Sequence, residues 1–259
     1  MNGNLIKGVK NALPFVVRSS KGHMVKTVCG KSFMDLTAGI GVTNLGHCHP
    51  KVTEAAQEAC GNLVHAQMNI MRHEPMMDVI KNLTSTNLAQ KASIDSWFLW
   101  NGGADAVEGA IKIARMATGK QNIITSNLGY HGRTFMTMGL TASGVSYRAG
   151  FGPLPSGIFQ SSFPYLSRSP HAQRTVNSDS SCSTCGADAE DLFKKCPSWG
   201  CQSQDVMEKE VKRCLAELEF LLRTQTAPSE TACIILEPVL VCDFDLHDDS
   251  YRLSVNLSA

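Results

Sequence analysis

Residues 101–108 read Asn-Gly-Gly-Ala-Asp-Ala-Val-Glu and stand where a strand gives way to a helix. The first backbone N–H groups of a helix lack partners within the helix and lie at its positive end, so they attract anions. The small residues 102–104 would let the backbone come close to a phosphate. The same residues also fit an ordinary turn, and Asp105 and Glu108 also fit the simple role of acids that complement the helix dipole.

A second group of candidate residues follows the next expected strand. Residues 130–134 read Tyr-His-Gly-Arg-Thr. The ring of Tyr130 could stack on a flat ligand, and the guanidinium of Arg133 could bind a carboxylate through two parallel hydrogen bonds. An exposed charge at a helix start is the alternative for Arg133. Because the carboxyl ends of parallel strands share one crevice, Glu237 at the end of a later apolar strand is expected at the same edge.

The elements that must position these residues follow from their periodicity. Residues 96–100 predict a buried strand, apolar residues at i, i+3, i+4 and i+7 from Val107 predict an amphipathic helix ending at Gly119, and residues 122–125 predict another strand. Strand, helix and strand in this order imply a right-handed crossover and a parallel sheet. The sequence therefore predicts an α/β fold with a mainly parallel sheet and helices on both faces.

Further elements are expected along the chain. They are short strands within 22–36 around a turn at 29–31, helices from Pro50 to Gly61 and within 74–89, a short helix at 132–140, a loop at 143–160, a helix at 205–224 and a strand at 231–236. In the helix at 205–224 the residues expected to face inward are Val206, Val211, Leu215, Leu218 and Leu222. The polar residues 167–204 predict an insertion.

Composition excludes two classes of partner. The chain has 259 residues, 43% of them hydrophobic, and a net charge of +1, which provides no electrostatic footprint for nucleic acid. Its apolar runs fall short of the roughly 20 residues that span a bilayer. The first 34 residues carry basic side chains and no acid, which fits a mitochondrial targeting segment or a basic surface strand. We expect the cytoplasm or the mitochondrial matrix, with the cytoplasm favoured.

Cysteine is the other unusual feature of the composition. Six of the ten cysteines are scattered through the expected helices and strands, a pattern that suits buried thiols in a reducing compartment. The other four have a spacing that could place thiolates around a zinc ion, with a plain loop as the favoured alternative. These four are Cys182, Cys185, Cys196 and Cys201.

Five motifs in a fixed order resemble a known family. The chain resembles the pyridoxal-phosphate-dependent class III aminotransferases, and within them the 4-aminobutyrate branch, over about residues 20–168 and 205–240. The motifs are residues 33–36 with 39–42, 44–52, 101–115, 130–134 and 235–239. The resemblance implies the large domain of the fold type I pyridoxal-phosphate transferases, and a homodimer for the complete enzyme.

The resemblance also implies roles for single residues. The backbone of Gly103 and Ala104 would bind the phosphate of the cofactor, and Tyr130 would stack on its pyridine ring. The implied reaction transfers an amino group between an amino acid and a 2-oxo acid, both small molecules.

Three further residues are implied in substrate binding. Arg133 would bind the carboxylate of an ω-amino acid such as 4-aminobutyrate. Ile40 would line the substrate pocket, with an ordinary core position as its alternative. Glu237 would lie near the substrate and help to separate the binding modes of the amine donor and the 2-oxo acid.

The resemblance ends near residue 240. The lysine that holds the cofactor in this family lies further on, so no catalytic residue is assigned, and Lys112 and Lys120 on the helix after the phosphate turn do not fit that role. We expect a C-terminally truncated, incomplete domain that does not transaminate and is poorly stable alone. The alternative is a non-catalytic relative that associates with a full-length aminotransferase subunit.

The expected domain organisation follows from these motifs. It has an N-terminal segment at 1–45, a partial large cofactor-binding domain at 46–240 with the insertion at about 167–204, and an off-pattern tail at 241–259.

Overall fold

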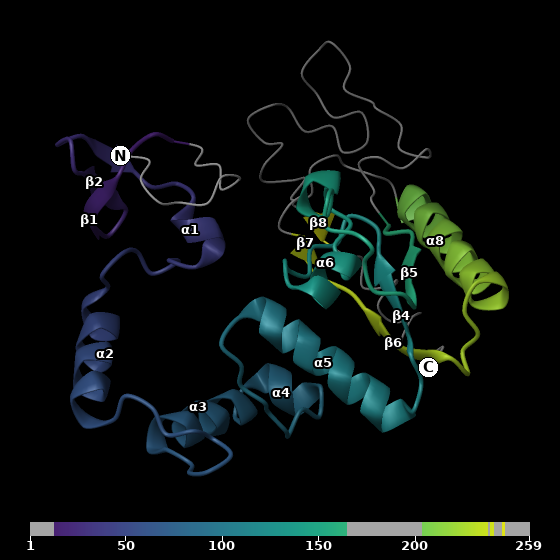
Figure 1. Cartoon of the computed structure of the whole chain (residues 1–259), viewed down its shortest axis with the longest axis horizontal. Helices are drawn as coiled ribbons and strands as arrows, with labels where there is room; N and C mark the ends of the chain where they lie inside the picture. The colour runs from purple at the N-terminus through teal and green to yellow at the C-terminus, as the bar shows by residue number, and fades with distance from the viewer. Residues whose placement is uncertain (1–12, 165–203, 238, 241–244, 247–259) are drawn as a thin grey trace. The chain divides into compact units, whose positions relative to one another are not determined.

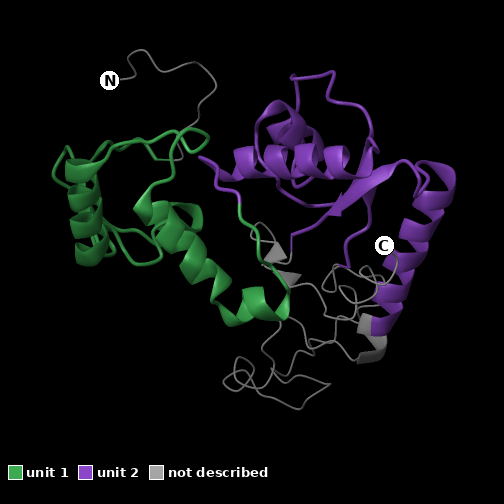
Figure 2. Cartoon of the chain, turned by 90° about the horizontal axis from the view of Figure 1, so that it is seen from below, with its two compact units in different colours: residues 1–97 green, residues 98–259 purple. Residues whose placement is uncertain are grey.

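The structure is a computed structural model that describes residues 13–164, 204–237, 239–240 and 245–246. The chain divides into two compact units, unit 1 at residues 1–97 and unit 2 at residues 98–259 (Figure 2). The domain boundaries predicted after residues 45 and 240 stay predictions.

Unit 1 begins with a small antiparallel sheet in the order β1-β2-β3. Its strands are β1 (Val17–Lys21), β2 (Met24–Thr27) and β3 (Ser32–Met34). The turn predicted between the last two strands is confirmed, and Gly30 supplies it with a positive φ of 86°. The ring of Phe15 packs on Phe33, with centroids 4.9 Å apart.

Short helices complete unit 1. They are α1 (Ala38–Gly41), α2 (Pro50–Asn62), α3 (Glu74–Thr84) and α4 (Asn87–Lys91). The helix predicted from Pro50 is confirmed, with the proline in the first turn, where its missing N–H has no intrahelical partner to lose. The stretch predicted at 74–89 is two helices, because Thr86 interrupts it and starts the second by accepting a hydrogen bond from the N–H of Ala89 at 3.2 Å.

Unit 2 is built on a parallel sheet in the order β5-β4-β6. Its strands are β4 (Asn122–Ser126), β5 (Ile158–Ser161) and β6 (Thr231–Ile235). The connection from β4 to β5 runs through a helix on one face. The return from β5 to β6 passes back across β4, so a right-handed crossover places its helix on the other face (Figure 1). The predicted α/β fold class is confirmed.

The helices of unit 2 cover both faces of β4. They are α5 (Gly103–Thr118), α6 (Phe135–Leu140) and α8 (Gln204–Thr224). On one face Ile123 packs with Ile111 and Leu140 from α5 and α6. On the other face Ile124 packs with side chains of α8, among them Leu218 and Leu221. Burying such a side chain contributes about 1.5–3 kcal/mol, so β4 is the centre of the unit's stability.

The strand predicted at residues 96–100 is wrong. These residues are not a strand in the structure, and none of the described strands pairs with them. The indole of Trp100 instead packs on Gly109 of α5, where an added Cβ would come within 2.4 Å of the ring. Conversely, residues 143–160 hold a short 3₁₀ helix, η1 (Val145–Tyr147), and the strand β5, which the Gly- and Pro-rich composition concealed.

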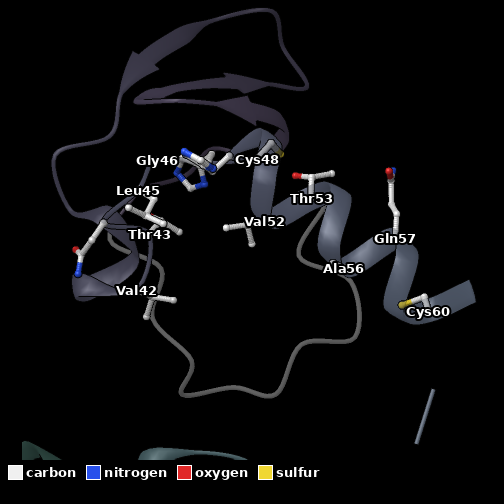
Figure 3. A pocket seen from close by; sticks show the side chains of 13 residues that line it. Val42, Thr43, Leu45, Gly46, Cys48, Val52, Thr53, Ala56, Gln57 and Cys60 are labelled. Carbon is white, nitrogen blue, oxygen red and sulfur yellow. The ribbon is translucent and has the colours of Figure 1, made fainter. Parts of the chain in front are cut away.

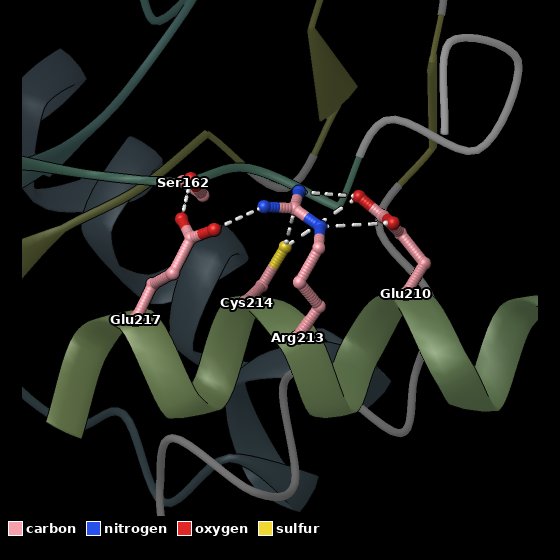
Figure 4. A network of polar contacts seen from close by, with 5 residues as sticks. All are labelled: Ser162, Glu210, Arg213, Cys214 and Glu217. Atoms are coloured by element: carbon pink, nitrogen blue, oxygen red, sulfur yellow. Dashed lines mark hydrogen bonds and ion pairs between the residues drawn. The ribbon is translucent and has the colours of Figure 1, made fainter. Parts of the chain in front are cut away.

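Helix α8 is fastened to the sheet by charged groups as well as apolar ones. Glu210 is 1% exposed and accepts hydrogen bonds from Arg213, whose other guanidinium nitrogen contacts Glu217, which in turn accepts from the hydroxyl of Ser162 after β5 (Figure 4). Burial raises the pKa of the neighbouring Cys214 thiol to about 12. The inward positions predicted for α8 are confirmed at Val211, Leu215, Leu218 and Leu222.

Several sequence predictions concern residues that the structure leaves undescribed. Among them are the side chain of Val206, the insertion up to residue 203, and Cys182, Cys185, Cys196 and Cys201. A two-stranded antiparallel pair, β7 (Val239–Leu240) and β8 (Asp245–Leu246), follows β6. Within the described ranges no helix has the length and apolar character of a membrane span, and no three His, Cys, Asp or Glu side chains gather as metal ligands would.

Candidate functional site

The phosphate turn predicted at residues 102–104 lies at the start of α5. Gly102 is extended, and its carbonyl accepts the first helical hydrogen bond from the N–H of Ala106 at 2.9 Å. The N–H groups of Gly103 and Ala104 therefore have no partner within the helix. A Cβ atom placed on Gly103 would meet nothing within 4 Å, so this backbone faces open space. The turn has the donors and the room that a phosphate needs.

The loop at residues 129–134 rests on this turn. A Cβ atom on Gly132 would lie 2.7 Å from the Cβ of Ala104 and 2.7 Å from the Oγ1 of Thr137. Gly132 also has a φ of 132°, which side chains disfavour. Only glycine permits this approach, which brings the loop that carries Tyr130 and Arg133 against the start of α5.

Glu108 connects the same two segments one helical turn further on. Its Oε1 accepts hydrogen bonds from the hydroxyl of Thr134 at 2.7 Å and from the N–H of Met136 at 3.2 Å. The sequence suggested only a dipole-complementing acid at this position. The signal that was available is spacing, because Ala104 and Glu108 are four residues apart and so share one face of α5.

Tyr130 meets the carboxyl end of β6. Its N–H donates to the Oε1 of Glu237 at 2.5 Å, as the parallel pairing of β4 with β6 allows. Burial raises the pKa of Glu237, and the hydrogen bond from Tyr130 opposes that shift. The phenol ring of Tyr130 packs edge to face on Tyr147, with centroids 5.2 Å apart. The candidate carboxylate and the candidate stacking ring therefore lie at one sheet edge.

His131 supports the loop from inside, a role that the sequence did not indicate. Its ring Nε2 lies 2.9 Å from the hydroxyl of Thr125 in β4, and its backbone N–H donates to the Oγ1 of Thr141 at 3.0 Å. Burial lowers the pKa of His131, which favours its neutral form at neutral pH. The histidine thus holds the loop to the sheet without placing a charge beneath the site.

Arg133 and Ile40 complete the set of predicted residues. Arg133 is exposed, and it forms no ion pair with any residue in the described ranges, so its guanidinium is available to a ligand. Ile40 belongs to unit 1, where it is 84% exposed and has a positive φ of 59°. Unit 2 therefore brings together five of the six predicted residues, and the role of Ile40 stays a prediction.

Unit 1 holds an open pocket of about 620 Å³ between residues 42–49 and α2 (Figure 3). Val42 and Val52 are among its apolar lining residues. The Nδ1 atom of His49, which also lines it, is buried and has no hydrogen-bond partner among the described residues. Most of the motif at residues 44–52 lies around this pocket.

Comparison with known proteins decides the family. The model of the class-III aminotransferases matches residues 6–241, which is most of the chain. The chain belongs to the class III aminotransferases. Pyridoxal phosphate is the cofactor of this family.

Among curated class III relatives, two are 5-aminovalerate aminotransferases named DavT. The one from Pseudomonas aeruginosa is 31% identical over 236 residues, which are 90% of this chain and 45% of that protein. The one from Pseudomonas putida is 40% identical over 161 residues, 61% of this chain and 37% of that protein. A probable 4-aminobutyrate aminotransferase of Bacillus subtilis is 35% identical over 164 residues, 63% of this chain and 37% of that protein. The chain thus matches less than half the length of each.

Solved transaminases share the fold. An (S)-enantioselective omega-transaminase from Thermomicrobium roseum matches with a TM-score of 0.71 at 23% identity, covering 96% of this chain and 51% of that one. An amine transaminase from an uncultivated Pseudomonas species, in its pyridoxal-phosphate-bound form, matches with a TM-score of 0.68 at 20% identity, covering 91% and 48%. The chain therefore carries about half of the fold type I architecture predicted from its motifs.

Proposed function

We propose that this chain provides part of the active site of a pyridoxal-phosphate-dependent aminotransferase that acts on an ω-amino acid such as 4-aminobutyrate. The observation that carries the proposal is the contact of Gly132 with Ala104, which sets the loop bearing Tyr130 and Arg133 on the phosphate turn. The names of the 5-aminovalerate and 4-aminobutyrate relatives support this substrate class.

The cofactor is held by backbone and ring. The N–H groups of Gly103 and Ala104 bind its phosphate at the start of α5. Tyr130 stacks on its pyridine ring, and the buried His131 keeps the loop in place behind it. When bound, the cofactor supplies an electron sink for the bond that is broken in amino transfer.

The substrate is an amino acid or a 2-oxo acid, and two charged side chains of unit 2 receive it. Arg133 binds the distal carboxylate through paired hydrogen bonds. Glu237 lies beside Tyr130 and separates the binding modes of the two substrates. Ile40 lines the substrate pocket in the assembled enzyme, which is a homodimer.

The lysine that holds the cofactor comes from outside the described residues. A helix rises about 1.5 Å per residue, so Lys112 lies roughly 13 Å along α5 from the phosphate turn, and Lys120 lies beyond the far end of the helix. The Nζ of Lys120 donates to the carbonyl of Pro228 at 2.8 Å. The described residues of unit 2 therefore bind the cofactor, and Lys112 and Lys120 do not supply the lysine.

A second candidate function is association with a full-length aminotransferase subunit without catalysis. The exposed apolar side chains of unit 1 favour it, because a chain with the same fold would cover them. They include Ile40, Val42, Leu45 and Val52.

A proline substitution tests the phosphate site. Gly103→Pro at the first helical position keeps the helix but removes one donor, so pyridoxal phosphate is expected to bind about tenfold more weakly, the effect of one hydrogen bond to a charged group. Titration is followed by absorbance, with pyridoxal, which has no phosphate, as the control ligand and Glu219→Ala as the control variant. Equal binding of pyridoxal phosphate to both variants would contradict the phosphate site.

Borohydride reduction and mass spectrometry test the second part of the proposal. The purified chain is expected to retain the cofactor without a lysine adduct and to show no transaminase activity with 4-aminobutyrate. Activity of the purified chain would contradict the proposal that these residues form an incomplete site.

A further inference from the structure

We propose that Glu108 is a positioning residue that fixes Arg133 relative to the phosphate turn and so sets the length of amino acid that the site accepts. This inference rests on the proposed function. No hydrogen bond or ion pair between the Glu108 carboxylate and the Arg133 guanidinium is found among the described residues. Glu108 acts through the two groups that it binds, the hydroxyl of Thr134 and the N–H of Met136.

The contacts bracket Arg133 on both sides. Gly132, just before it, packs on Ala104, and Thr134, just after it, donates its hydroxyl hydrogen to Glu108. Ala104 and Glu108 lie on one face of α5, one turn apart. The backbone of Arg133 is thus held to α5 from both neighbours, while its side chain stays exposed.

Glu108 also stabilises the helix that follows the arginine. Thr134 is the N-cap of α6, and its N–H and hydroxyl contact Thr137 in a reciprocal cap. The N–H of Met136 is one of the first-turn donors that a helix cannot satisfy internally, and Glu108 accepts it. A single carboxylate therefore ties the start of α6 to the second turn of α5.

In this arrangement α5 fixes the distance between the site of the cofactor phosphate and the backbone of Arg133. The phosphate binds at the first turn of the helix, and the carboxylate binds at a guanidinium whose backbone is fastened to the first and second turns. A rigid helix keeps that separation constant, so substrates that differ by one methylene meet the guanidinium unequally. Without Glu108 the Thr134 side of Arg133 is held only through the apolar packing of α6, and the separation becomes more variable.

The test begins with the link itself. Hydrogen exchange of the Met136 amide is compared in wild type, Glu108→Ala, Glu108→Gln and Glu219→Ala, the last a surface glutamate of α8. Loss of the acceptor is expected to speed exchange about tenfold in Glu108→Ala, while Glu108→Gln stays near wild type because its amide oxygen still accepts both bonds. Unchanged exchange in Glu108→Ala overturns the proposal.

Ligand binding then tests the consequence. The probes are pyridoxamine phosphate, which has no carboxylate, and the reduced phosphopyridoxyl adducts of 4-aminobutyrate and 5-aminovalerate. In wild type one adduct is expected to bind about tenfold more tightly than the other two ligands, the discrimination typical of one methylene. Glu108→Ala is expected to lose most of that preference and to bind pyridoxamine phosphate unchanged, and Glu108→Gln is expected to restore it.

Thr134→Val removes the same hydrogen bond by changing its donor instead of its acceptor. It therefore serves as a control for a folding defect that affects only Glu108→Ala. It removes the donor hydroxyl and is expected to lose the same preference. A wild-type chain that binds the adducts no more tightly than pyridoxamine phosphate overturns the proposed function as well. A wild-type preference that survives in both variants overturns only the role of Glu108.

Discussion

Unit 1 and unit 2 differ in how much of their apolar surface is buried within each unit. In unit 2 the central strand β4 is covered on both faces, and Ile123, Ile124 and Leu140 are fully buried. In unit 1 the helix α2 has no buried residue, and only a few apolar side chains, such as Met76 and Ala89, are buried. Local signals such as an N-terminal proline and a threonine cap mark where helices of unit 1 begin, whereas packing across a sheet positions the site in unit 2.

Truncation of an apolar side chain should show the largest difference between the two units in the free energy of unfolding. Ile124→Ala is expected to lower the free energy of unfolding by about 3 kcal/mol, because it leaves a cavity between β4 and α8. The matched change in unit 1, Val52→Ala, removes an exposed side chain and should cost less than about 0.5 kcal/mol. Urea unfolding followed by circular dichroism measures both, and equal losses would contradict the comparison.

Two arginines of α8 extend the comparison from apolar to charged groups. Arg213→Met removes the guanidinium from the buried Glu210 and is expected to cost about 3 kcal/mol. Arg223→Met breaks an exposed pair with Glu219 and should cost under about 0.5 kcal/mol. Both variants lose one positive charge, so a difference between their urea midpoints measures the effect of the burial of Glu210 relative to the exposed Glu219. Similar midpoints would show that Glu210 does not need Arg213.

Two glycines should respond in opposite directions to the same change. Gly132→Ala places a methyl group against Ala104 and is expected to destabilise unit 2 by about 1–3 kcal/mol and to weaken pyridoxal phosphate binding. Gly61→Ala in α2 meets nothing within 4 Å and should stabilise unit 1 by up to about 1 kcal/mol. Thermal unfolding and cofactor titration of both variants test this. Cofactor binding by Gly132→Ala at wild-type strength would argue against the loop contact.

The smallest expected effects concern pH. Burial lowers the pKa of His131 below its usual value of 6.5 in the folded state. As the pH falls, His131 is therefore protonated in the unfolded chain before it is protonated in the folded chain. The stability that neutral His131 contributes to unit 2 is then lost as the pH falls below 6.5. Hydrogen bonds from Thr37 and His47 lower the pKa of Asp35 from 3.8 to about 2, so its contribution to unit 1 is lost only as pH falls from 3.8 through about 2.

Acid unfolding should therefore begin in unit 2. Hydrogen exchange resolved by segment between pH 7 and pH 2 measures the order, and His131→Gln and Asp35→Asn should each reduce the pH dependence of their own unit. Loosening of unit 1 before unit 2 would contradict the assignment.

Prediction from sequence succeeded where a local pattern carries the information. The helices α2 and α8, the strand β6 and the α/β class follow from apolar spacing and from the residues that begin and end each element. It was wrong at residues 96–100, because an apolar run becomes a strand only when a neighbour pairs with it, and Trp100 packs on Gly109 instead.

The candidate site shows the same division. Order and spacing of the motifs were enough to select Gly103, Ala104, Tyr130, Arg133 and Glu237 as candidates. Glu108 and His131 were missed because their partners become neighbours only after folding. Glu108 accepts a hydrogen bond from Thr134, 26 residues further along the chain, and His131 contacts Thr125 in β4 and Thr141 just after α6.

The sequence by itself determined the family and the α/β class and selected candidate residues for binding a phosphate and a carboxylate, because these depend on residue type and on spacing along the chain. Only the tertiary structure decided that Gly132 rests on Ala104, that Glu108 secures the start of α6 and that Glu237 accepts the N–H of Tyr130. Those contacts join different elements, and their distances are set by how helices and strands pack, which no local pattern specifies.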